Sequence, residues 1–244
     1  MPNRFNRSSF YRQFSLSKTS KEKISAIMHS FDINNKIRFY PKLKDMHRAP
    51  KGYQKIKILF MATAWDPYNN PDRSKEKIEE RIYINEMRAN CIRLLRKEFG
   101  NNFYGGLMHN EFTIKMYKDA LLENKNNALK KNYINILNEF PICVATMGLH
   151  GSIGGKFAEY VAFSKGILSE KMNFQLPGNL EKDKNYLEFT TPEECVNQAV
   201  KLSSNKEMLT NMMYYNLIYY HHYVRPDMLI LNSLISSLKN RLGN

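Results

Sequence analysis

Cysteine is scarce in this sequence, with three residues in a chain of 244. Cys91, Cys143 and Cys195 lie far apart and lack the close pairing of zinc ligands, so the sequence predicts no metal site and no disulfide framework. We interpret them as buried thiols in a reducing compartment.

Long hydrophobic runs are also missing. No apolar stretch approaches the roughly 18 residues of a membrane-spanning helix. The first residues do not form a charged-then-apolar secretion leader. We therefore expect a cytoplasmic protein that neither spans a membrane nor is secreted.

Acidic residues are few: the chain has 23 Asp and Glu and 37 Lys and Arg, which gives a net charge of +14. Residues 1–55 hold 13 Lys or Arg against 3 Asp or Glu, which is +10 of that total. Aromatic residues such as Phe5 and Phe10 interleave with these charges, so an anionic membrane surface is a candidate partner and the protein is a candidate for membrane association. A solvated arm without a fixed partner is the alternative. Nucleic acid is not favoured, because no recognisable binding module accompanies the charge.

Apolar residues make up 43% of the chain and aromatic residues 12%, enough for a globular core. Strand-like and helix-like segments alternate along it. Strands are expected over 57–63, 103–107, 142–146, 166–169 and 186–190, and helices over 74–100, 113–122, 128–140, 152–162 and 192–202. This alternation predicts an α/β fold, a Rossmann-like parallel sheet with helices on both faces.

Three regions follow from this pattern. Residues 1–55 are interpreted as a basic linker or the remnant of an N-terminal domain. Residues 56–204 form the predicted Rossmann-like domain. Residues 205–244 form helices, separated near Arg225 and Pro226, that pack back on the fold.

The most informative segment joins the predicted strand at 142–146 to the next helix. Glycines at 148, 151, 154 and 155 allow close approach of a ligand to the backbone, and Ser152 is placed to cap a helix that begins near it. Unpaired amides at a helix start bind anions. His150, Lys156 and Glu159 add polar groups, so the segment predicts a phosphate site; a plain strand-to-helix turn is the alternative.

This segment resembles the donor-binding segment of two-domain, group 1 type glycosyltransferases, which have a Rossmann-like B-type fold. The resemblance rests on the run from Gly155 to Glu170, in which a glycine loop and helix carry a glutamate before a small-residue stretch and a strand. It implies that Glu159 binds the ribose of a nucleotide sugar and that Gly151, Ser152, Gly154 and Lys156 hold the diphosphate. An upstream glutamate found in many members is replaced here by Gly151.

Further site residues follow from the same resemblance. A basic pair after the first strand binds the diphosphate in the family, which makes Arg73 and Lys75 candidates, although the usual Gly-Arg start is replaced by Ala64 and Trp65. Solvated surface charges are the alternative for both. The catalytic base is not identified by the motifs, and His150 and Asp66 are the candidates.

The resemblance implies a glycosyltransferase, or its donor-binding part, with no cofactor besides a nucleoside diphosphate sugar as substrate. The acceptor would be a glycan or lipid-linked precursor in cell-surface polysaccharide synthesis. The alternative is a non-catalytic nucleotide-sugar-binding module that acts with a partner chain. An oxidoreductase is less favoured, since no Gly-x-Gly-x-x-Gly follows the first strand.

Overall fold

The computed structural model describes residue 20 and residues 43–178 and 180–242. The interpretation of residues 1–42 as part of a basic linker or domain remnant therefore lies outside the described residues.

Five parallel strands form one sheet in the order β2-β1-β3-β4-β5. The strands are β1 (Ile58–Ala62), β2 (Phe103–Leu107), β3 (Ile142–Ala145), β4 (Gly166–Glu170) and β5 (Leu187–Phe189). The α-helices are α3 (Lys75–Phe99), α4 (Glu111–Met116), α5 (Lys130–Glu139), α6 (Gly155–Ala162), α7 (Pro192–Ser204), α8 (Lys206–Tyr219) and α9 (Pro226–Leu242). Shorter helical elements are η2 (Leu43–Asp45), η3 (Gly100–Asn102), η4 (Lys118–Ala120), η5 (Lys125–Ala128), η6 (Leu149–Gly151) and the π-helical η7 (Tyr220–Val224).

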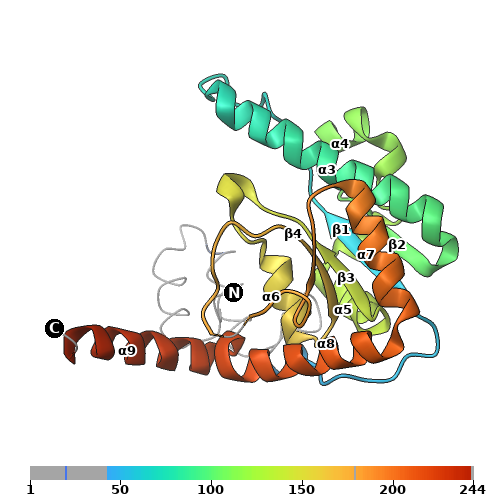
Figure 1. The fold of residues 1–244 in the computed structure, drawn as a ribbon. Helices are drawn as coiled ribbons and strands as arrows, with labels where there is room; N and C mark the ends of the chain where they lie inside the picture. The colour runs from blue at the N-terminus through green and yellow to red at the C-terminus, as the bar shows by residue number, and fades with distance from the viewer. Residues whose placement is uncertain (1–19, 21–42, 179, 243–244) are drawn as a thin grey trace.

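The sheet is buried on both faces, which explains the nearly continuous apolar character of its strands. In β1, Ile58 and Phe60 pack with α3 and α7, while Leu59 and Met61 pack with α5 and α6. Alternate residues of a strand point to opposite faces, so two cores form, one on each side of the sheet (Figure 1). The predicted Rossmann-like α/β architecture is confirmed.

The helix expected over 113–122 is shorter than predicted. It ends as α4 at Met116, and the chain then passes through η4 into an extended segment. The Leu122 amide donates to the Leu107 carbonyl at 2.9 Å, so this segment runs beside the end of β2. Gly106 permits this approach, because a Cβ there would lie 2.4 Å from the Leu122 nitrogen.

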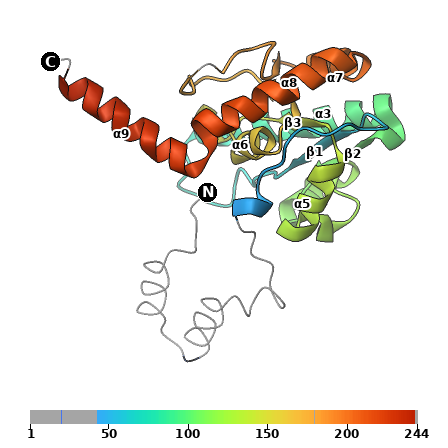
Figure 2. The same cartoon turned by 90° about the horizontal axis from the view of Figure 1, so that it is seen from below.

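The C-terminal helices follow the sheet domain. Helix α8 contacts α6, α7 and β4. After η7 the direction changes at Arg225 and Pro226, and α9 extends beyond the sheet and its covering helices (Figures 1 and 2). Across the described residues, no helix is long and apolar enough to cross a bilayer.

Candidate functional site

The strand order reverses between β1 and β3, where a parallel sheet usually opens a crevice for a ligand. Here Arg88 of α3 fills this position. Its guanidinium donates to the carbonyls of Thr63 and Met147 and lies 4.4 Å from the Trp65 ring centroid. Burial lowers the Arg88 pKa to about 10. Arg88 therefore ties the ends of β1 and β3 together and fills the crevice position with its own side chain.

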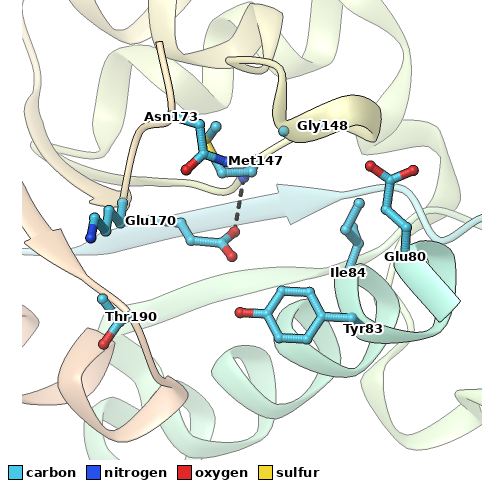
Figure 3. Close-up of a pocket in the computed structure, with 10 residues that line it drawn as sticks. Glu80, Tyr83, Ile84, Met147, Gly148, Glu170, Asn173 and Thr190 are labelled. Atoms are coloured by element: carbon cyan, nitrogen blue, oxygen red, sulfur yellow. Dashed lines mark hydrogen bonds between the residues drawn. The ribbon is translucent and has the colours of Figure 1, made fainter. Parts of the chain in front are cut away.

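A cavity of about 410 Å³ lies beyond the ends of β3, β4 and β5. This volume is within the usual range for small-molecule sites. It is lined by Glu80, Tyr83, Ile84, Met147, Gly148, Gly151, Glu170, Lys171, Asn173 and Thr190 (Figure 3). The N-terminal half of α3 thus faces the loops that follow three strands.

Glu170 is the buried acid of the cavity. One carboxylate oxygen accepts a hydrogen bond from the Met147 amide at 2.9 Å, and the carboxylate faces the Tyr83 ring of α3 (Figure 3). Burial raises the pKa of Glu170, although the Met147 hydrogen bond and the charge of Arg88 oppose this shift. Burial and the nearby Glu170 in turn raise the Tyr83 pKa.

The turn between β3 and α6 forms the opposite wall. His150 and Gly151 both adopt left-handed backbone conformations, with φ of 60° and 61°. Successive left-handed or turn residues direct their amides into a concave surface that suits an anion. The His150 amide donates to the carboxylate of Glu80 from α3, so this turn already holds an anionic group.

The predicted cap of α6 is wrong. The helix begins at Gly155 with Gly154 as its N-cap, and no side chain caps it. Ser152 instead closes the preceding turn, because its carbonyl accepts from the Gly148 amide at 2.6 Å and its amide donates to the Leu149 carbonyl. The helix therefore begins three residues later than predicted, and Ser152 ends the separate turn η6 instead of starting the helix.

Lys156 and Glu159 lie on the α5 side of α6 and are not among the residues that line the cavity. Glu159 is buried and forms a 2.7 Å ion pair with Lys130. The Lys156 ammonium lies 3.9 Å from the centroid of the Tyr133 ring, and burial lowers its pKa to about 8. Both side chains are engaged within the protein in this conformation.

The basic pair after β1 is also engaged. The Arg73 guanidinium donates to the Asp66 carbonyl at 3.1 Å and to the Asn69 side chain at 2.6 Å, so it holds its own loop together. Lys75 is exposed and lies 3.7 Å from Glu79. Asp66 accepts from the Tyr68 amide at 2.8 Å in the same loop.

Of the predicted site residues, Gly151 lines the cavity. His150 contacts the cavity lining, because its amide donates to Glu80. Sequence reasoning did not assign Glu80, Tyr83, Arg88 or Glu170 to the site. Glu170 ends β4, and its place at a strand's carboxyl end is the signal that points to it. The α3 residues carry no local signal, since only the packing of that long helix brings them there. Within residues 43–178 and 180–242, no group of three or more His, Cys, Asp or Glu side chains is placed to hold a metal ion.

Comparisons by sequence give no match, either to a family model or to a curated protein. Comparisons of structure do. The C-terminal domain of a glycosyl transferase group 1 family protein, LpcC from Francisella tularensis, matches with a TM-score of 0.49 and 9% identity, over 75% of this chain and 98% of that domain. A TarM mutant from S. aureus, in complex with fondaparinux, alpha-GlcNAc-glycerol and UDP, matches with a TM-score of 0.50 and 16% identity. A putative UDP-N-acetylglucosamine 2-epimerase from Listeria monocytogenes matches with 0.47 and 16% identity.

This chain spans about half the length of two of these proteins. The TarM match covers 88% of this chain but 42% of TarM, and the epimerase match covers 82% of this chain but 51% of the epimerase. At these identities the likeness is one of fold. On that level, the TarM match and the all-parallel sheet confirm the predicted resemblance to the fold of group 1 type glycosyltransferases.

Proposed function

We propose that this chain binds a nucleoside diphosphate sugar and acts as a glycosyltransferase or its donor-binding part. The observation that carries the proposal is the β3–α6 turn, whose His150 amide holds the Glu80 carboxylate at the edge of a cavity. A carboxylate and a phosphate are both oxyanions that bind backbone amides. The diphosphate would therefore take the place of Glu80, with Gly151, Ser152 and Gly154 close to it.

The rest of the cavity suits a hydroxylated group. Glu170, Asn173 and Thr190 line it and supply a carboxylate, an amide and a hydroxyl, which are the groups that bind sugar hydroxyls. The assignment of Glu159 to the ribose remains a proposal that requires its ion pair with Lys130 to open. Phosphate contacts by Lys156, Arg73 or Lys75 likewise require these side chains to leave their present partners.

For the acceptor we propose a glycan or lipid-linked precursor of a cell-surface polysaccharide, with transfer on the cytoplasmic side. UDP is the first nucleotide to test, because TarM, the match with a TM-score of 0.50, was solved in complex with UDP. No cofactor besides the nucleotide sugar is proposed. His150, which is exposed, and Asp66 remain the candidates for a catalytic base.

A second candidate function is a non-catalytic nucleotide-sugar-binding module that acts with a partner chain. One observation favours it. Each cavity carboxylate has one oxygen held by a backbone amide, Glu80 by His150 and Glu170 by Met147, and these contacts give both groups a role in holding the loops together. The two functions differ in turnover, because the module binds the donor without transferring or hydrolysing it.

The test is calorimetric titration of the purified chain with UDP, GDP, ADP, CMP and NAD, repeated with Gly151→Ala and Gly155→Ala. A Cβ at Gly151 would lie 2.6 Å from the Asn173 amide nitrogen, on a backbone with positive φ, whereas nothing lies within 4 Å of a Cβ at Gly155. We expect one nucleoside diphosphate to bind, Gly151→Ala to weaken it about tenfold, and Gly155→Ala to leave it unchanged.

Circular dichroism establishes that both variants remain folded. Binding of NAD alone, or equal nucleotide affinity in both glycine variants, would overturn the proposal. Release of UDP from a UDP-sugar with an added acceptor distinguishes the enzyme from the module.

A further inference from the structure

Helix α9 exposes an apolar face. Ile230, Leu234 and Leu238 form one ridge at four-residue spacing, with side chains 64%, 58% and 56% exposed. Leu231 and Ile235 form the adjacent ridge, at 45% and 40% exposed. The helix projects from η7 beyond the sheet domain (Figures 1 and 2), and none of these residues belongs to either of the two cores.

The face is broad and is opposed by a polar one. At 3.6 residues per turn, the two ridges span an arc of about 140°. Ser233 and Ser236 lie on the other side of the helix beside one apolar residue, Leu229, and Ser237 borders the ridge at Ile230. The helix is therefore amphipathic without being highly charged. Such a helix, too short and too polar to span, fits the plane between lipid headgroups and acyl chains.

The charge of the chain is suited to an anionic surface. Residues 228–242 contain no Asp or Glu but contain Lys239 and Arg241. The whole chain carries +14. Basic residues near a membrane are attracted by anionic lipids over about a Debye length, so the charge brings the helix to the surface and the apolar ridges hold it there.

A second copy of the chain is a poorer occupant. The three-four spacing of Met228, Leu231, Ile235 and Leu238 makes a seam of about two heptads, fewer than the three to four that indicate a coiled coil. Such a seam would leave Ile230 and Leu234, the most exposed apolar residues of α9, in water. Two chains of +14 also repel one another.

We propose that α9 is a membrane-surface anchor, which lies on an anionic bilayer with the ridge of Ile230, Leu234 and Leu238 between the acyl chains. The proposal goes beyond donor binding and does not depend on it. The charge distribution alone suggests a membrane contact through residues 1–55, whereas this proposal assigns the contact to the C-terminal helix.

The test is co-sedimentation of the full chain with phosphatidylcholine vesicles, with and without phosphatidylglycerol. The ridge variant is Ile230→Gln/Leu234→Gln/Leu238→Gln, which keeps good helix formers. The control is Ser233→Gln/Ser236→Gln on the polar face. We expect binding only to the anionic vesicles, a loss of at least about tenfold in the ridge variant, and little change in the control.

Three results would overturn the proposal. Retained vesicle binding in the ridge variant that is abolished by salt would assign it to basic residues elsewhere. A dimer in sedimentation velocity that the ridge variant dissolves would assign the face to a second copy. Absence of vesicle binding by the wild-type chain would leave α9 without a membrane role. Nucleotide titration of the ridge variant should match the wild type, so failure here is separable from failure of donor binding.

Discussion

Glu80 occupies the turn that we propose for the diphosphate, so removing its charge is expected to strengthen nucleotide binding. Its carboxylate accepts from the His150 amide, which lies next to Gly151 in the left-handed part of the turn. A nucleotide that binds there must displace this carboxylate or sit beside it. Glu80→Gln keeps the size and the hydrogen-bonding capacity of the side chain but not its negative charge.

The magnitude combines two contributions. A hydrogen bond to a charged group contributes about 1.5 to 3 kcal/mol, which we reduce to about 1 kcal/mol because His150 is exposed and Glu80 only half-buried. Repulsion between the carboxylate and one phosphate charge about 5 Å away in water adds about 1 kcal/mol. Together they predict that Glu80→Gln binds the nucleotide about 10- to 30-fold more tightly.

The assay is calorimetric titration with the nucleoside diphosphate that the wild type prefers. Glu79→Gln is the matched control, because it removes the same charge one residue away. Glu79 is exposed and lies 3.7 Å from Lys75. We expect a much smaller gain in affinity than in Glu80→Gln, because Glu79 and its partner Lys75 are both exposed. Weaker binding in Glu80→Gln would mean that Glu80 contacts the ligand directly, and equal gains in both variants would reduce the effect to overall charge.

Three further predictions concern the groups around the sheet edge. Glu159→Ala should weaken nucleotide binding by about 1 to 3 kcal/mol if Glu159 binds ribose. Lys130→Ala should then strengthen binding, because Glu159 no longer has to leave an ion pair, whereas equal losses in both variants would make the ion pair structural. Arg88→Lys should lower the free energy of unfolding, measured by urea denaturation, by about 2 to 4 kcal/mol. The reason is that lysine cannot reach all the partners of a buried guanidinium. A loss below about 1 kcal/mol would contradict this prediction. Burial lowers the Lys156 pKa to about 8, so unfolding takes up a proton between pH 8 and 10.5. The free energy of unfolding of the wild type, relative to that of Lys156→Met, should therefore rise by about 1 to 3 kcal/mol as the pH increases through this window. Parallel pH profiles of the two proteins would refute the prediction.

The sheet is predictable from the sequence because each strand is a short apolar run between glycine, proline or polar residues. Pro141 and Gly148, for example, enclose the residues of β3. Helix ends are less predictable where a loop competes for the same residues. Ser152 has the character of a cap, but it closes η6 because its carbonyl bonds to Gly148.

Some residues of the candidate site are predictable from the sequence and others are not. Gly151 is found from sequence because a glycine turn after a buried strand is a local pattern. Glu80 and Arg88 are not, because they reach the site through the tertiary packing of a 25-residue helix. Lys156 and Glu159 show the converse: both sit beside the glycine turn in sequence, but α6 directs them toward Lys130 and Tyr133 on α5.

The most direct test of donor binding is a crystal structure of the chain with the nucleoside diphosphate that binds most tightly. The diphosphate is predicted on the amides of residues 149–151, with the Glu80 carboxylate moved away and the sugar or ribose near Glu170. A diphosphate bound elsewhere, with Glu80 still on the His150 amide, would contradict the proposed site.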